Sequence, residues 1–81
     1  MRLDKYLKVS RLIKRRTVAN EACDSARISV NGRPAKASYD VKVGDVIEIP
    51  FGARTVRVEV LQVQDAVRKE DAALLYREIA E

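Results

Sequence analysis

The sequence contains no histidine and only one cysteine, Cys23. Because zinc sites in proteins are built mainly from cysteine and histidine, this composition argues against a metal site, and Cys23 has no partner for an internal disulfide. The chain also lacks a glycine-rich phosphate loop and a histidine to activate the thiol, which disfavours the common enzyme classes. We expect Cys23 to be a small buried apolar residue and the protein to need no catalytic residue, cofactor or metal.

Long apolar runs are missing as well. The longest are only a few residues, far below the roughly 20 that cross a bilayer, and charges stand where a signal peptide needs an apolar stretch. We therefore expect a cytoplasmic protein with no membrane partner. With 81 residues, 47% hydrophobic and 35% charged, the composition is typical of one compact domain, too small to hold separate catalytic and binding domains.

Positive charge is concentrated in the first part of the chain. Residues 1–36 contain ten Lys or Arg against three Asp or Glu, whereas residues 37–81 contain six against nine. The net charge of +4 therefore combines a strongly basic N-terminal segment with a mildly acidic remainder. Such a directional field favours a polyanionic partner, and nucleic acid is the first to consider.

The basic segment has the pattern of two short helices. Apolar residues at helical spacing occupy one face of residues 2–9 and leave the cations on the other face. A stripe of small apolar residues predicts a second helix over 18–26, with Thr17 as its N-cap. The turn between them, 10–16, is expected to turn two apolar residues inward and to present three cations.

The remaining chain alternates with the period of strands. Strands are expected at 28–30, along a return strand through 37, and at 46–49 and 55–63. Asn31-Gly32 favours a tight hairpin turn, and Pro50 is expected to end its strand or to lie at an edge. Helix formers with acids in the first turn predict a C-terminal helix within 70–79. These elements indicate an α+β fold: two N-terminal helices packed on a small, mainly antiparallel sheet, plus a short C-terminal helix, in a single domain over 1–81.

A group of cations forms the candidate binding surface. Its members are Arg2, Lys5, Lys8, Arg11, Lys14, Arg15, Arg16 and Arg27, with Lys36 near the return strand. Each Lys or Arg that neutralises a phosphate releases condensed counterions, and Arg also grips two phosphate oxygens at once. The alternative is a solvated basic face with no partner.

Three other residues near these cations allow two interpretations each. Asp4 either stabilises the start of the first helix or orients a neighbouring arginine such as Arg16. Tyr6 shares the apolar helix face and is expected in the core, although an aromatic ring could also stack on a base. Tyr39 lies beside a turn, and both roles remain open for it.

Five short motifs follow one another over about residues 1–49. They are RLDKYL at 2–7, SRLI at 10–13, RRTVA at 15–19, ISVNG at 28–32 and VKVGDVI at 41–47. Together they resemble the successive blocks of an S4 RNA-binding domain, which has the alpha-L fold, and residues 50–81 would then be a strand and helix extension. The small size resembles the stand-alone bacterial members of this family, which include the ribosome-associated heat-shock protein and factors of ribosome-associated quality control.

This resemblance implies an RNA-binding surface and a set of partners. S4 domains bind structured RNA with their helical face, and the matching positions here are Arg2, Lys5, Arg11, Arg15, Arg16 and Thr17, with Asn31 and Gly32 in the hairpin. The quality-control members bind large ribosomal subunits that hold peptidyl-tRNA and contact 23S rRNA and tRNA. There they help a tail-extending factor to lengthen the nascent chain without messenger RNA. The resemblance further implies a monomer away from the ribosome.

One position departs from the family pattern. The family usually has glycine after the second helix, where this chain has Ala26 and then Arg27, so this helix is expected to end differently.

Other functions remain as alternatives. The protein could instead act in recycling stalled subunits, or bind structured RNA in general, without a role in tailing. A protein-interaction module that uses the acidic C-terminal helix is a third class, and duplex DNA is a fourth possible partner.

Overall fold

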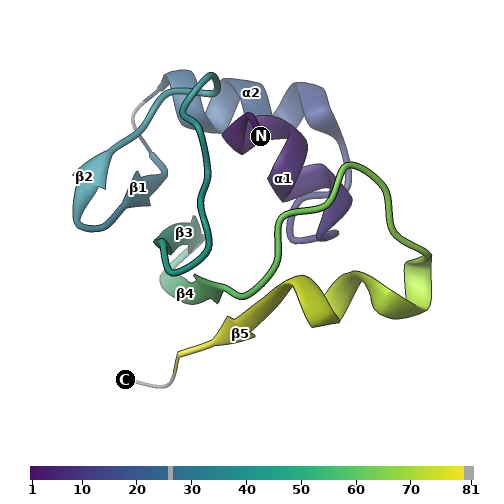
Figure 1. Ribbon diagram of the computed structural model, residues 1–81. Coiled ribbons are helices and arrows are strands. Elements are labelled where there is room, and N and C mark those ends of the chain that lie inside the picture. Colours follow the sequence, from purple (N-terminus) through teal and green to yellow (C-terminus); the bar gives the residue numbers. More distant parts are fainter. Residues whose placement is uncertain (26, 80–81) are drawn as a thin grey trace.

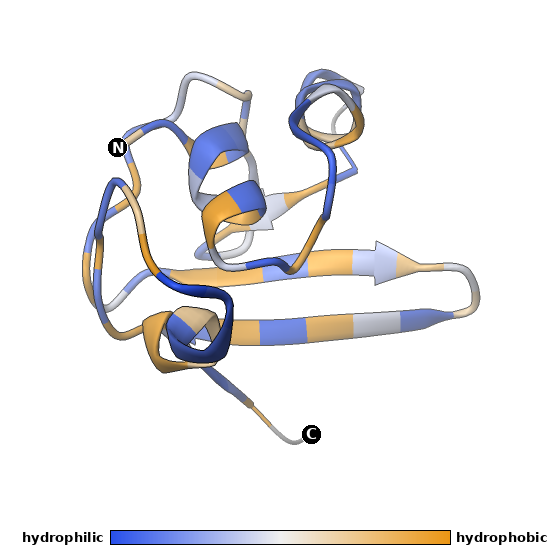
Figure 2. Cartoon of the chain, turned by 90° about the vertical axis from the view of Figure 1, so that its right-hand side faces the viewer, coloured by the Kyte–Doolittle hydropathy of each residue, from blue (hydrophilic) through white to orange (hydrophobic). Residues whose placement is uncertain are grey.

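The computed structural model describes residues 1–25 and 27–79, which form two α-helices, a 3-10 helix and a five-stranded antiparallel sheet of order β2-β1-β3-β4-β5 (Figure 1). The elements are α1 (Leu3–Val9), α2 (Arg16–Asp24), β1 (Ser29–Val30), β2 (Arg33–Pro34), β3 (Val46–Phe51), β4 (Arg54–Val60), η1 (Lys69–Leu75) and β5 (Tyr76–Glu78). Both α-helices lie on the same side of the β3–β4 hairpin (Figure 2). The α+β class is confirmed. No helix in the described ranges is long and apolar enough to cross a membrane.

Helix α1 forms where its apolar spacing predicts it. Leu3, Tyr6 and Leu7 are fully buried and join the core cluster with Ile47 and Val58 of the central strands. The Tyr6 hydroxyl donates a hydrogen bond of 2.8 Å to the Leu75 carbonyl, so its polar atom is satisfied inside the core. Tyr6 is therefore a core residue, as expected.

Helix α2 begins earlier than predicted. Its N-cap is Arg15, in extended conformation and without a side-chain cap, and Thr17 lies exposed within the first turn. The prediction of Thr17 as N-cap is therefore wrong; Arg16, the first residue of the helix, bonds to Asp4 of α1. The helix ends at Asp24 with Ser25 as its C-cap, so the prediction that it extends to residue 26 is wrong; residue 26 itself lies outside the described residues.

The buried side of α2 contains the single cysteine. Cys23 is 1% exposed and packs in the core together with Ala19. Burial, aided by the negative charges of Asp4 and Asp24, raises the pKa of the thiol to about 11. The thiol is thus protonated at neutral pH and poorly reactive, which agrees with the expected role as a small apolar residue.

The β1–β2 hairpin turns at Asn31-Gly32, as predicted. Both residues have positive φ, 53° and 82°, which is the conformation that a tight two-residue hairpin turn requires. The return strand ends at Pro34 rather than continuing to residue 37, so its predicted length is wrong. The reason is that Ala37 and Tyr39 turn to α1, where their carbonyls accept hydrogen bonds from the first-turn amides.

The central strands β3 and β4 pair over their whole length. Pro50 lies inside β3, opposite Thr55, and the strand continues to Phe51. Strand β1 pairs with β3 only at Ile47 and Glu48 and does not extend to Pro50. At Pro50, strand β3 is therefore paired on one side only, by β4, which confirms the prediction that this residue lies at an edge. Strand β4 ends at Val60, short of the predicted residue 63.

The C-terminal region differs most from its prediction. A helix is present, but it is the 3-10 helix η1, and it ends at Leu75, whereas Tyr76–Glu78 forms strand β5 along the free edge of β4. Leu75 is buried in the core, and its carbonyl accepts hydrogen bonds from two backbone amides that follow β4. These tertiary contacts override the local helix propensity, so the predicted helix over 76–79 is wrong.

Candidate nucleic-acid interface

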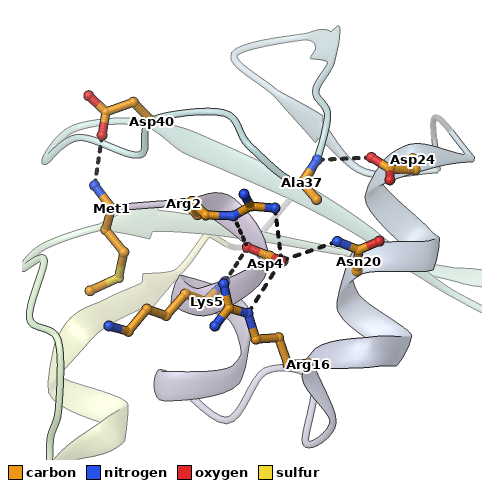
Figure 3. A network of polar contacts seen from close by, with 9 residues as sticks. All are labelled: Met1, Arg2, Asp4, Lys5, Arg16, Asn20, Asp24, Ala37 and Asp40. Atoms are coloured by element: carbon orange, nitrogen blue, oxygen red, sulfur yellow. Dashed lines mark hydrogen bonds and ion pairs between the residues drawn. The ribbon is translucent and has the colours of Figure 1, made fainter.

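A buried carboxylate joins the two N-terminal helices. Asp4 is 2% exposed and accepts hydrogen bonds from Arg2 Nε at 3.1 Å, Arg16 Nε at 3.4 Å and Asn20 Nδ2 at 3.3 Å (Figure 3). A longer bond of 3.5 Å joins Arg2 Nη2 to the second carboxylate oxygen. The backbone amide of Lys5 adds a bond of 2.8 Å from the start of α1. Both interpretations of Asp4 are therefore confirmed, since it bonds the helix start and it orients arginine.

The charge state of Asp4 follows from these contacts. Burial by itself raises the pKa of this carboxyl group, but the hydrogen bonds from Arg2, Asn20 and the Lys5 amide, with the charge of Arg16, outweigh it. The pKa of Asp4 is therefore lowered from its ordinary value. At neutral pH the carboxylate is ionised and holds two guanidinium groups near one another.

The two arginines that Asp4 holds remain accessible. Their side chains are 50% exposed in Arg2 and 48% exposed in Arg16. Together with Asp4, Thr17, Asn20 and the exposed Glu21 they line an open hollow on the surface of α1 and α2. A guanidinium has five N–H donors, so each arginine keeps donors for a ligand after bonding to Asp4. This arrangement of two oriented cations can grip phosphate oxygens.

A second basic hollow lies beside the end of α1. Lys8, Arg11 and Lys14 line it, all three are exposed, and Asp65 lies on its opposite side. Lys5 forms an ion pair of 3.3 Å with the same Asp65. Arg11 has a φ of 62°, a left-handed conformation that is uncommon for a residue with a side chain, and its amide bonds to the Lys8 carbonyl. This hollow has three cations against one carboxylate, whereas Asp4 and Glu21 balance the two arginines of the first hollow, so the first hollow is distinguished by the fixed geometry of its arginines and not by excess charge.

Of the remaining predicted cations, Arg15 and Lys36 lie near these hollows, whereas Arg27 lines an apolar groove on the other side of α2. Arg15 is exposed at the start of α2, directly before Arg16. Lys36 is exposed beside Ala37, whose amide bonds to Asp24 of α2 and whose carbonyl bonds to the Asp4 amide. The segment that contains Lys36 therefore lies against both helices.

The hairpin residues have a structural role in addition to any contact with RNA. The Asn31 side chain donates to Asp45 at 3.0 Å and accepts from the Val46 amide at 3.0 Å, and Gly32 is exposed at the turn. Tyr39, half-buried, donates its hydroxyl to the same Asp45 at 3.0 Å. The main contribution of these side chains is thus to fix the hairpin against the turn before β3.

Sequence reasoning missed two members of the site. Asn20 was not among the predicted residues, although it lies four positions after Arg16 and thus on the same helix face. Asp65 was missed because it reaches the basic residues only through the fold of the segment after β4. In the described ranges no cluster of three or more His, Cys, Asp or Glu side chains could hold a metal ion.

Comparisons with known proteins show the family of the chain. The sequence matches the S4 domain over residues 1–47. It is 59% identical over 81 residues to the RQC P-site tRNA stabilizing factor of Streptococcus pneumoniae, covering 100% of this chain and 92% of that protein. It is 58% identical over 76 residues to the protein of that name from Bacillus subtilis, covering 94% and 88%. Heat shock protein 15 of Vibrio cholerae, solved as a trimer, superposes with a TM-score of 0.92 at 32% identity, over 99% of this chain and 82% of that one.

Proposed function

The chain belongs to the S4 domain family, and from this premise we propose that it is a non-enzymatic RNA-binding factor of ribosome-associated quality control. It docks on large ribosomal subunits that hold stalled peptidyl-tRNA and contacts 23S rRNA and tRNA. The observation that carries the proposal is the pair Arg2 and Arg16, which come from different segments and are oriented by one buried carboxylate. The names of the bacterial relatives, at 59% and 58% identity, support the tRNA and the quality-control context.

The physical argument for RNA rests on preorganisation. Asp4 fixes the two guanidinium groups before any ligand arrives, so little side-chain entropy is lost when they bind phosphate. The cations of the second hollow and the Lys36 segment surround this pair and extend the basic surface. A surface assembled from two helices and a loop matches an irregular folded RNA better than the regular groove of duplex DNA.

The finer part of the proposal concerns what happens on the subunit. By steadying the tRNA, the protein supports a tail-extending factor that lengthens the nascent chain without messenger RNA. It works in the cytoplasm, where ribosomes are, and is a monomer away from them. Recycling of stalled subunits without tailing is the alternative to this finer role. A tailing assay with the factor added back to depleted extract separates the two.

The decisive variant removes both oriented arginines. We expect Arg2→Ala combined with Arg16→Ala to weaken co-sedimentation with large subunits by about a hundredfold, because two charge-assisted contacts are lost at about 1.5 kcal/mol or more each. The matched control is Arg54→Ala with Arg77→Ala, which removes the same charge from strands β4 and β5 of the sheet.

The control variant is expected to bind like the wild type. Circular dichroism and urea unfolding of both variants check that the fold is retained. If the Arg2 and Arg16 variant pellets with large subunits at the wild-type level, the contact surface lies elsewhere and the proposed function loses its structural basis.

A further inference from the structure

An apolar groove opens on the other side of α2. Eight apolar side chains line it, from the turn after α1, from α2, from the residue before β1 and from the second half of β3: Leu12, Ile13, Val18, Ala22, Ile28, Ile49, Pro50 and Phe51. Two cations, Lys14 and Arg27, complete the lining. Val18 is 48% exposed and Phe51 is 45% exposed, so the groove is open to solvent. Figure 2 shows α2 end-on above the β3–β4 hairpin.

The groove and the Arg2–Arg16 hollow lie on different faces of α2. Arg16, Thr17 and Asn20 face the hollow, whereas Val18 and Ala22, four positions apart, face the groove. No residue lines both. A ligand in the groove therefore leaves the oriented arginines accessible, although Lys14 lines both this groove and the second basic hollow.

The composition of the groove indicates its occupant. Seven of the eight apolar side chains are aliphatic, and only Phe51 offers an aromatic face on which a base could stack. Single exposed apolar residues are ordinary on a protein surface. Here six exposed or partly exposed apolar side chains gather around one hollow, over the buried Ile28 and Ile49, and such a grouping is typical of an interaction site. The cations Lys14 and Arg27 add a positive potential, which favours a partner that carries negative charge.

We propose that this groove binds a short amphipathic segment of a partner protein, in which apolar side chains enter the groove and neighbouring Asp or Glu residues pair with Lys14 and Arg27. Short helices commonly bind hydrophobic grooves in this way, with anchors at positions i, i+3 or i+4 and i+7. The groove would then link the RNA-bound protein to a second protein component. This inference does not depend on which RNA the Arg2–Arg16 surface binds.

The test is a selection of random peptides displayed on phage against the full-length protein. We expect the enriched peptides to combine apolar residues with Asp or Glu, and their synthetic versions to shift the amide NMR signals of Val18, Ala22 and Phe51. Phe51→Ser or Val18→Ser should weaken peptide binding by about tenfold or more, as loss of an apolar anchor does. Replacing Lys14 and Arg27 by Glu should weaken it similarly and favour basic peptides instead.

Two controls separate this surface from others. Leu74→Ser changes an apolar side chain that is 60% exposed outside the groove, and it should leave peptide binding unchanged. The Arg2→Ala and Arg16→Ala variant should also keep peptide binding while it loses RNA binding, so that a failure of one proposal does not affect the other.

Three outcomes would overturn the inference. One is a selection that enriches no peptides, or peptides whose NMR shifts lie outside the groove. Another is self-association at high protein concentration that Phe51→Ser abolishes, because the occupant would then be a second copy of this chain. The third is a loss of binding to folded RNA in Phe51→Ser and Val18→Ser, because the groove would then belong to the RNA surface.

Discussion

The helical region and the sheet region use their charged side chains differently. In the sheet, arginine and carboxylate pair one to one: Arg54 with Glu78, Arg57 with Glu48 and Arg77 with Glu59. In the helical region one buried carboxylate, Asp4, serves both Arg2 and Arg16. One-to-one pairs leave a nearly neutral surface, whereas the shared carboxylate leaves positive charge in a fixed geometry. The position of the carboxylates, more than the number of arginines, thus distinguishes a binding surface from a stabilised sheet.

The largest expected effect of this difference is in the salt dependence. If about six cations of the helical region contact phosphates, affinity for large subunits falls by about a thousandfold between about 50 and 200 mM salt. Arg2→Gln and Arg16→Gln should each make this dependence shallower, whereas Arg54→Gln and Arg77→Gln should not change it. Binding measured at graded salt checks this, and equal slopes in all four variants would remove the distinction between the two regions.

The stability of the protein in acid tests the role of the buried carboxylate in the helical region. Because the folded pKa of Asp4 is lowered, its contribution to stability is fully present above the unfolded value of about 3.9 and is lost as pH falls through the folded pKa. Asp4→Asn has no charge to lose there, so its free energy of unfolding should depend less on pH in this range. Urea unfolding between about pH 2 and 6 measures the slope.

The control for the acid experiment is Asp40, whose pKa is also lowered, here by its hydrogen bond to the N-terminal ammonium group. Its side chain is 70% exposed. We expect Asp40→Asn to change the slope less than Asp4→Asn does, since exposed ion pairs contribute little to stability. A larger effect from Asp40 would show that the buried network is not the main acid-sensitive contact.

The sequence predicts the parts of the fold that local interactions determine. The apolar face of α1, the turn at Asn31-Gly32 and the alternation in β4 each depend on neighbours within a few residues, and all three appear in the structure. The C-terminal region fails because β5 forms by pairing with β4, far from it in sequence. Local propensity cannot account for a free strand edge that a later segment covers.

The site is predictable to a similar extent. Charge counting identifies Arg2 and Arg16 as members of a basic segment, and the motif order adds the family. Neither the charge count nor the motif order can show that Asn20 and Asp4, sixteen positions apart, meet between two packed helices. The apolar groove was missed for the same reason, because Phe51 and Val18 come together only in the folded chain.

The most direct test of the account compares Asp4→Asn with Glu59→Gln. Both make the protein more positive, one at the shared carboxylate and one at a sheet pair, so electrostatics alone predicts equal or tighter binding to large subunits for both. If Asp4 orients Arg2 and Arg16, then Asp4→Asn binds about tenfold more weakly, the loss of about one charge-assisted contact, while Glu59→Gln binds at least as well as the wild type. Tighter binding by a folded Asp4→Asn protein would contradict the account.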